Sequence, residues 1–169
     1  EGVAASIKTF TGEDMPQIPT EVTAVAEESG KVTLSWTLPE AGINGGWVNL
    51  TKVSYDILRN GESLSTDIKE TTYIDNLPEN ELKSYKYTVI VKFGGEECGS
   101  VESNSVVFGK AVSLPYEQTF EDASSFDLLN IIDNNGDGVT WQFDTGQFSA
   151  GYTFSADNAA DDYLVLPKM

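Results

Sequence analysis

Hydrophobic residues in this chain alternate with polar ones over short runs, and almost none recur at the spacing of a helix. Residues 32–36 and 53–57 alternate in this way, and residues 85–93 form the longest such run. A period of two is that of a half-buried β-strand. Turn-forming residues separate the runs at positions 28–30, 44–46, 59–61 and 94–95. Short strands at this spacing predict an antiparallel β-sandwich, so the expected fold class is all-β.

Landmarks of one sandwich family follow one another along residues 17–110. They are a proline-marked start at Pro16 and Pro19, Trp36 in the second strand, Tyr55 in the third, Leu77-Pro78 after the fifth, and a sixth strand at residues 87–91. This order resembles a fibronectin type III domain. The resemblance implies that Tyr87 is the tyrosine-corner residue, with its ring in the core and its hydroxyl bonded to the backbone. A last strand near residues 105–108 would close the unit, and residues 109–115 are expected to form a linker.

An acidic loop occupies residues 133–138. Asp133, Asn135 and Asp137 place oxygen-bearing side chains at alternate positions around a glycine turn. This spacing suits a hard cation, and Ca²⁺ better than Mg²⁺, because Mg²⁺ loses its water reluctantly. The alternative is a polar turn without a metal, but three such side chains repel one another unless a cation neutralises them. An EF-hand is not expected, since residues 139–143 alternate like a strand and not like a helix.

The acidic loop also belongs to a second resemblance. Phe120-Glu121, the loop with Trp141 three residues beyond it, and residues 162–165 with Pro167 resemble the start of the cleaved-adhesin or choice-of-anchor family. These are MAM-like jelly rolls of secreted and surface proteins of Bacteroidetes. The resemblance implies that Glu121 joins the loop as a calcium ligand, and either Asp161 or Asp162 is the further candidate, with Asp162 preferred.

We therefore expect three segments. Residues 1–16 are the end of a preceding domain or a linker, in which residues 4–12 look like a final strand. Residues 17–110 are a fibronectin type III-like sandwich, and residues 111–169 are the N-terminal part of a jelly-roll sandwich. Family members run beyond the strand at residues 162–165, so the chain is either a truncated module or is completed by another chain, because a sandwich that lacks strands exposes sheet edges.

Charge and residue usage exclude several classes of function. The chain has 27 acidic and ten basic residues, a net charge of −17, which repels nucleic acid and anionic membrane surfaces. It has no histidine, the commonest general base and transition-metal ligand, and it lacks a G-x-S-x-G nucleophile motif. The single cysteine, Cys98, cannot form an internal disulfide. We therefore expect no enzyme and no membrane insertion.

Trp47 is the candidate ligand-binding residue. It lies in a glycine-rich connection and outside the alternating inward faces, and exposed rings stack on sugars or anchor protein interfaces. The alternative is that Trp47 packs over its own loop. The expected function is a non-catalytic, calcium-stabilised adhesion module, secreted or on the cell surface, that binds a host protein or glycan. The alternative is an accessory region or spacer of a multidomain secreted hydrolase, either a protease or a glycosidase.

Overall fold

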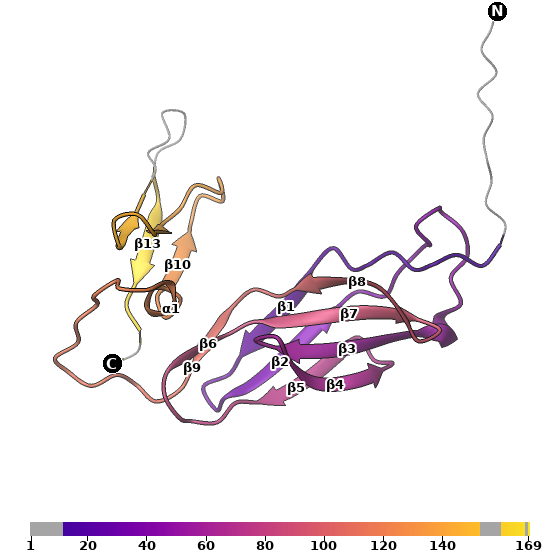
Figure 1. The fold of residues 1–169 in the computed structure, drawn as a ribbon, viewed down its shortest axis with the longest axis horizontal. Coiled ribbons are helices and arrows are strands. Elements are labelled where there is room, and N and C mark those ends of the chain that lie inside the picture. The colour runs from indigo at the N-terminus through magenta and orange to yellow at the C-terminus, as the bar shows by residue number, and fades with distance from the viewer. Residues whose placement is uncertain (1–11, 153–159, 168) are drawn as a thin grey trace, which may run out of the picture. The chain divides into compact units, whose positions relative to one another are not determined.

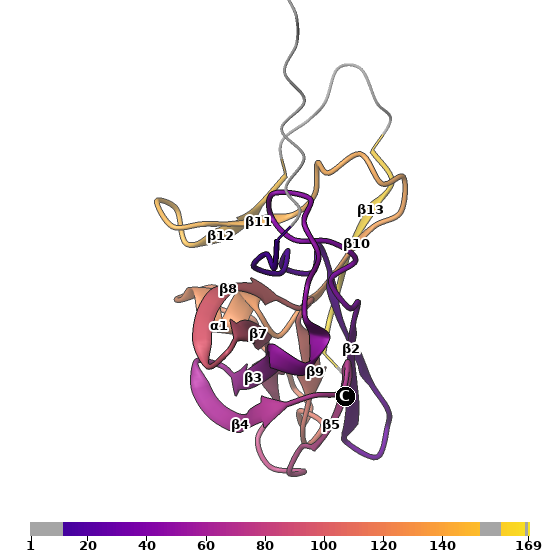
Figure 2. The ribbon, with the colours of Figure 1, turned by 90° about the vertical axis from the view of Figure 1, so that its right-hand side faces the viewer.

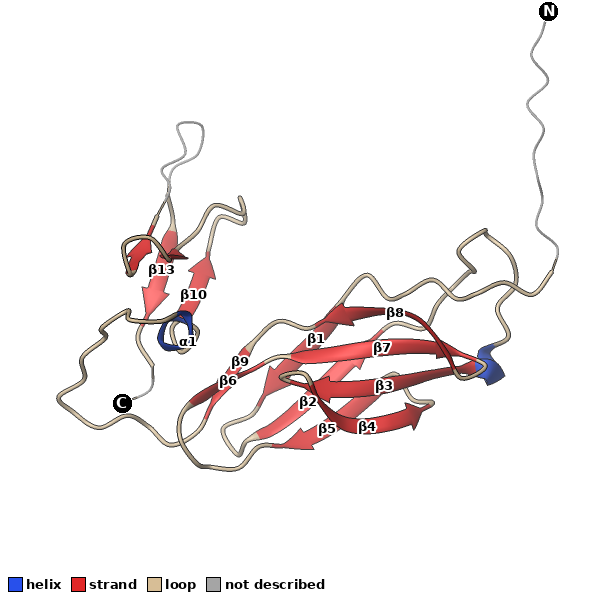
Figure 3. Ribbon diagram, in the orientation of Figure 1, coloured by secondary structure: helices blue, strands red, loops and turns tan. Residues whose placement is uncertain are grey.

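The computed structural model describes residues 12–152, 160–167 and 169, and the regular elements of this part of the chain are almost all β-strands (Figures 1 and 3). The predicted all-β class is thus confirmed. The chain divides into two compact units, which are described separately: unit 1 is Glu1–Asn76 with Tyr85–Val106, and unit 2 is Leu77–Ser84 with Val107–Met169. Among the described residues, no helix has the length and the apolar character needed to cross a membrane.

Unit 1 is a sandwich of two antiparallel sheets, which Figure 2 shows as separate layers. The first sheet has the order β1-β2-β5, from β1 (Val22–Ala26), β2 (Lys31–Trp36) and β5 (Thr72–Asn76). The second has the order β4-β3-β7-β8, from β3 (Val53–Arg59), β4 (Glu62–Ile68), β7 (Tyr87–Phe93) and β8 (Glu96–Glu102). A short 3₁₀ helix, η1 (Leu50–Lys52), precedes β3, and β6 (Lys83–Tyr85) pairs with β9 (Val106–Phe108).

The expected strands at residues 32–36, 53–57 and near 105–108 are confirmed, but the long run at residues 85–93 is interrupted. It divides at Lys86 into β6 and β7. The reason is that Lys86 bonds to the turn after β3 instead of continuing a ladder: its N–H donates to Asn60 Oδ1 at 2.8 Å, and its carbonyl accepts the Asn60 N–H at 2.8 Å.

The core of unit 1 follows from the alternation of its strands. Every second residue of β2 and β7 points inward and is buried. Burying one large apolar side chain stabilises the fold by roughly 1.5–3 kcal/mol. The ring of Trp36, in the first sheet, meets the edge of Tyr55, in the second, with centroids 5.2 Å apart and planes at 69°. The fully or nearly fully buried side chains of these strands are Val32, Leu34, Trp36, Tyr55, Ile57, Tyr87, Val89 and Val91.

A buried carboxylate also joins the two sheets. Asp75 on β5 is 7% exposed, and its Oδ2 accepts both Arg59 Nη1 from β3 and the Tyr87 hydroxyl from β7, each at 2.8 Å. The guanidinium of Arg59 lies 5.9 Å from the ring centroid of Tyr85. Burial, and then the hydrogen bond to Asp75, raises the pKa of Tyr87, so its hydroxyl remains a donor.

The prediction for Tyr87 is therefore half right. Its ring lies in the core, with no exposed surface. Its hydroxyl was expected to bond to the backbone but donates instead to the carboxylate of Asp75. A charged acceptor makes a stronger hydrogen bond than a neutral carbonyl does. A buried carboxylate is also costly unless it accepts hydrogen bonds.

The described residues of unit 2 form two antiparallel ribbons and one short helix. The ribbons are β10 (Asn130–Asp133) with β13 (Asp162–Val165), and β11 (Gln142–Asp144) with β12 (Ser149–Gly151). Helix α1 (Ala123–Phe126) begins after Asp122, whose Oδ1 accepts the Ser125 N–H at 2.8 Å. The buried Phe126 packs against the rings of Phe120 and Phe143, at 6.5 and 5.9 Å. The strand expected at residues 139–143 begins only at Gln142.

The units differ from the expected segments in two places. Residues 13–16, expected to precede the sandwich, pair with a loop of unit 1 through the bridges Glu13–Trp47 and Pro16–Gly42. Residues 77–84 group with unit 2, in which the Lys110 N–H donates to the Asn80 carbonyl at 2.6 Å. The strand expected at residues 4–12 falls, except for Gly12, outside the described residues.

We expect the Arg59–Asp75–Tyr87 contact to dominate the stability of unit 1. Asp75→Ala leaves a guanidinium and a hydroxyl without their acceptor, so it should lower the free energy of unfolding by about 3–5 kcal/mol. Tyr87→Phe removes one hydrogen bond to a charged group and should lower it by about 1.5–3 kcal/mol. Urea unfolding measures both changes.

The matched control is the ion pair between Lys86 and Glu102, whose side chains are 48% and 60% exposed. Because water screens such a pair, Glu102→Ala should change the free energy of unfolding by less than about 1 kcal/mol. Equal effects of Asp75→Ala and Glu102→Ala would contradict the assigned role of Asp75.

Candidate functional site

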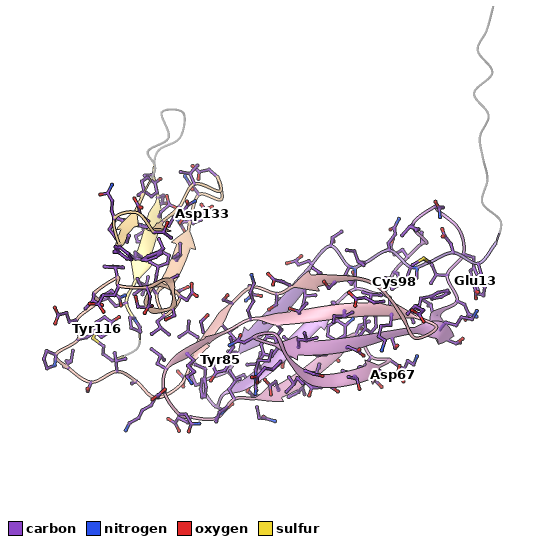
Figure 4. All side chains as sticks on the ribbon, viewed as in Figure 1. Glu13, Asp67, Tyr85, Cys98, Tyr116 and Asp133 are labelled. Carbon is purple, nitrogen blue, oxygen red and sulfur yellow. The ribbon has the colours of Figure 1, made fainter. Side chains whose placement is uncertain are left out.

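The acidic loop between β10 and β11 is folded around Asp133, labelled in Figure 4. Asp133 Oδ1 accepts the Gly136 N–H at 2.7 Å, and Oδ2 accepts the Gly138 N–H at 2.9 Å. Both glycines have positive φ, 68° and 76°, a conformation that residues with a Cβ rarely adopt. The two glycines thus allow the loop to close on a single carboxylate.

The other two predicted ligands of the loop contact each other. Asn135 Nδ2 donates to Asp137 Oδ2 at 3.1 Å, and Asp137 Oδ1 accepts the Val139 N–H at 2.8 Å. The structure therefore brings Asp133, Asn135 and Asp137 into one short, internally bonded loop. The bond to Val139 also explains why the chain enters β11 later than the alternation predicts.

Asp162 lies opposite Asp133. The two residues are direct partners in the antiparallel β10–β13 pair, where facing side chains have Cβ atoms about 4.5–5.5 Å apart and like charges are destabilising. Asp162 Oδ2 accepts the Tyr152 hydroxyl at 2.9 Å, whereas its Oδ1 is buried without a hydrogen-bond partner among the described residues. A buried carboxylate oxygen is costly unless a donor or a cation satisfies it.

Burial and the nearby carboxylates raise the pKa of Tyr152. Burial raises it first, then the hydrogen bond to Asp162, and the negative charges of Asp137 and Asp133 raise it further. Three of the predicted ligands, Asp133, Asp137 and Asp162, therefore act on the same phenol. Their charges are concentrated at one end of the β10–β13 ribbon.

Two further acids that the sequence predicted near this site, Glu121 and Asp161, make different contacts. Glu121 is exposed in the segment before α1, and no hydrogen bond of the described residues joins it to the loop. Asp161 bonds to Asn134, whose Nδ2 donates to Asp161 Oδ2 at 2.6 Å and whose N–H donates to the Asp161 carbonyl at 3.0 Å. Within the described part of the chain, no three His, Cys, Asp or Glu side chains form a group that could hold a metal ion.

Trp47 lies on the connection between β2 and η1 and is 64% exposed. Its alternative role, packing over its own loop, does not fit this exposure. Ile43 on the same connection is 58% exposed, and its N–H donates to the carbonyl of Met15, which is 42% exposed. Met15, Ile43 and Trp47 together are called the loop surface below.

The loop surface is held in place by Asp14, which is 5% exposed. Its Oδ1 accepts the Met15 N–H at 2.9 Å and Asn44 Nδ2 at 3.0 Å, and its Oδ2 accepts the N–H groups of Asn44 and Gly46 at 2.7 and 3.1 Å. The Asp14 N–H donates to the Trp47 carbonyl at 2.8 Å. A Cβ on Gly42 would lie 2.3 Å from Asp14 Oδ2, so glycine provides the room for this contact.

Sequence reasoning missed Asp14, because it assigned residues 1–16 to a linker or a preceding domain. Burial alone would raise the pKa of Asp14, but the hydrogen bonds from Asn44, Gly46 and Met15 lower it below its ordinary value. The pair of glycines at residues 45 and 46 could have indicated this role, because such a turn has N–H groups that need an acceptor.

No protein-family model matches this chain, and no curated protein matches it either. The two resemblances therefore depend on the residues named for them. The function has to be argued from the loop surface of unit 1 and the carboxylates of unit 2.

We expect Asp14→Asn to release the loop that carries Trp47. An asparagine places an NH₂ group where one carboxylate oxygen accepts two donors, so at least two hydrogen bonds are lost. The measurement is hydrogen exchange at the amides of Asn44 and Gly46, which should lose protection. Glu28→Gln, at an exposed acid in the turn before β2, is the control and should leave both amides protected; their continued protection in Asp14→Asn would contradict the role of Asp14.

The same amides should report pH in the unchanged chain. Because the pKa of Asp14 is lowered by folding, its contribution to stability is present above the unfolded-state pKa, about 3.9. It is lost as the pH falls through the lower folded-state value. Protection of Asn44 and Gly46 should therefore decrease only below about pH 4, and a loss between pH 5 and 7 would contradict this assignment.

Proposed function

We propose that this chain is a non-catalytic binding module of a secreted or cell-surface protein. The loop surface of unit 1 contacts a host protein or glycan, and Ca²⁺ stabilises unit 2. The observation that carries the proposal is the loop surface itself: Trp47 is 64% exposed, although its backbone is fixed by the buried Asp14.

The physical argument concerns the cost of binding. Ordering a flexible loop on binding costs conformational entropy and weakens the affinity, whereas a loop that is already fixed avoids this cost. Asp14 fixes this loop through four accepted hydrogen bonds, so Trp47, Ile43 and Met15 are presented in one arrangement. Exposed tryptophans with apolar neighbours are typical anchors of interfaces and of sugar stacking.

The architecture supports the adhesion class. In unit 1 Trp36, Tyr55 and Tyr87 are buried, which supports the proposed fibronectin type III-like sandwich. In unit 2 the acidic loop lies between two ribbons, as the start of a cleaved-adhesin-like jelly roll would need. Within the described residues β10 and β13 pair only with each other, so a further strand, from a longer form of this chain or from another chain, is proposed to complete that sheet.

The donor set of unit 2 fits calcium. The acids of the loop supply hard oxygen ligands, and calcium also accepts amide and backbone carbonyl oxygens. Asp133 and Asp162 face each other, and Asp162 Oδ1 lacks a partner among the described residues. Each carboxylate oxygen has two lone-pair sites, so Asp133 can hold the loop N–H groups and a cation together. Asn135, Asp137 and Glu121 remain the proposed further ligands.

Calcium should stabilise unit 2 selectively. At a calcium concentration a hundredfold above the dissociation constant, the free energy of unfolding should rise by about 2.7 kcal/mol, because only the folded unit binds the ion. Calorimetric unfolding in calcium, in magnesium and in excess chelator measures this rise. Asp137→Ala should abolish it, and the exposed Glu117→Gln should not; identical unfolding in calcium and chelator would contradict the calcium site.

The binding role is tested with immobilised matrix glycoproteins, before and after enzymatic removal of their glycans. Trp47→Ala should weaken binding at least about tenfold, as expected for a central aromatic anchor, without changing the unfolding midpoint. Phe148→Ala, at a second aromatic that is 60% exposed, is the matched control and should bind normally. A chain that binds none of these proteins would favour a spacer, and a Trp47→Ala variant that binds fully would contradict the role of Trp47.

A further inference from the structure

Unit 2 contains an open pocket of about 230 Å³ beside the acidic loop. It lies where the two ribbons begin and end: Trp141 precedes β11, Tyr152 follows β12, and residues 160–163 include the start of β13. The side chains that line it are three aromatic rings, two carboxylates and one methyl group. They are Trp141, Tyr152, Ala160, Asp161, Asp162 and Tyr163.

The aromatic rings form a corner. The centroids of Trp141 and Tyr152 are 5.7 Å apart, and their planes are tilted by 54°, so the two rings do not stack face to face. Tyr163 adds a third ring to the lining and is 53% exposed. The faces of aromatic rings carry negative potential and attract cations within about 6 Å.

The carboxylates make the same pocket anionic. Asp162 accepts the Tyr152 hydroxyl through Oδ2 and has a buried Oδ1 without a partner among the described residues. The Tyr152 hydroxyl is thus directed to a carboxylate and is not a free donor for a ligand.

No cationic side chain balances these charges in the described structure. The six ion pairs among the described residues all lie elsewhere, and none includes Asp161 or Asp162. Across residues 111–169 of the sequence, Lys168 is the one basic residue. A pocket with aromatic walls and two carboxylates that have no ion-pair partner among the described residues therefore has the chemistry to hold a cation that comes from outside the unit.

We propose that this pocket binds an organic cation, the ammonium or guanidinium group of a lysine or arginine side chain on a basic peptide. The rings of Trp141, Tyr152 and Tyr163 contact the alkyl stem and the face of the cation, and Asp161 and Asp162 accept its N–H groups. A calcium ion prefers oxygen ligands, and the ring faces supply none. A neutral sugar can donate its hydroxyls to Asp161 and Asp162 but brings no positive charge to balance them.

This site goes beyond the proposed function, because it lies in unit 2 and not at the loop surface. It shares Asp162 with the proposed calcium site, so Asp162 is left unchanged in the test. The variants instead change Asp161 and Tyr163. Running each titration in calcium and in excess chelator separates the two proposals, since calcium binding alone would alter the spectra without any peptide cation.

The experiment is an NMR titration of the whole chain with Nα-acetyl-arginine amide and Nα-acetyl-lysine amide. Nα-acetyl-citrulline amide is the uncharged comparator of the same shape as the arginine compound. The expected result is saturable shifts of the Trp141 indole N–H and the amides of residues 160–163, with binding at least about fivefold tighter for arginine than for citrulline. Equal binding of citrulline, or no saturable shift, would overturn the proposal.

Variants locate the binding in the pocket. Asp161→Asn keeps an oxygen for Asn134, and Tyr163→Ser changes an exposed ring, so both should fold and give a native spectrum. Each should weaken arginine binding by about fivefold or more, whereas Glu117→Gln, an equal change of charge at an exposed acid of the same unit, should not. Unchanged affinity in both pocket variants would overturn the assignment even if arginine binds.

Discussion

In this chain 27 acidic side chains share only ten basic ones, so most carboxylates have no cationic partner. Burying a carboxylate that accepts no hydrogen bonds costs more free energy than a single contact provides, so every buried acid needs several donors. Asp75 receives Arg59 and Tyr87 and ties the two sheets of unit 1 together. Asp14 receives four N–H groups and fixes the loop that exposes Trp47. The sandwich and its loop surface both depend on this compensation.

Unit 2 differs because part of its negative charge is left without a partner among the described residues. Asp133 and Asp162 face each other across a ribbon, and one oxygen of Asp162 is buried and unbonded. Asp162 also lines a pocket with aromatic walls, together with Asp161. A cation supplied from solution would lower the repulsion at the loop, and one supplied by a peptide would do so in the pocket. Both proposals for unit 2 therefore have a common electrostatic cause.

Local patterns predicted the strands of unit 1, because inward and outward positions alternate within each strand and burial follows them. Contacts between distant residues were not predictable in this way. The break at Lys86 depends on Asn60, and the role of Asp14 depends on a loop some 30 residues later in the chain. Spacing likewise indicated Asp133, Asn135 and Asp137, which share a loop. That Asp133 faces Asp162 follows from strand register, which no local pattern contains.

Anomalous diffraction from a crystal of the chain grown in calcium tests the central claim, that the facing carboxylates of unit 2 are neutralised by a cation. The account predicts a peak beside the ribbon end, with oxygens of Asp133 and Asp162 at about 2.3–2.6 Å from it, the usual range for calcium. Ordered water alone between the two carboxylates, with no anomalous peak at a calcium concentration far above physiological, would contradict it.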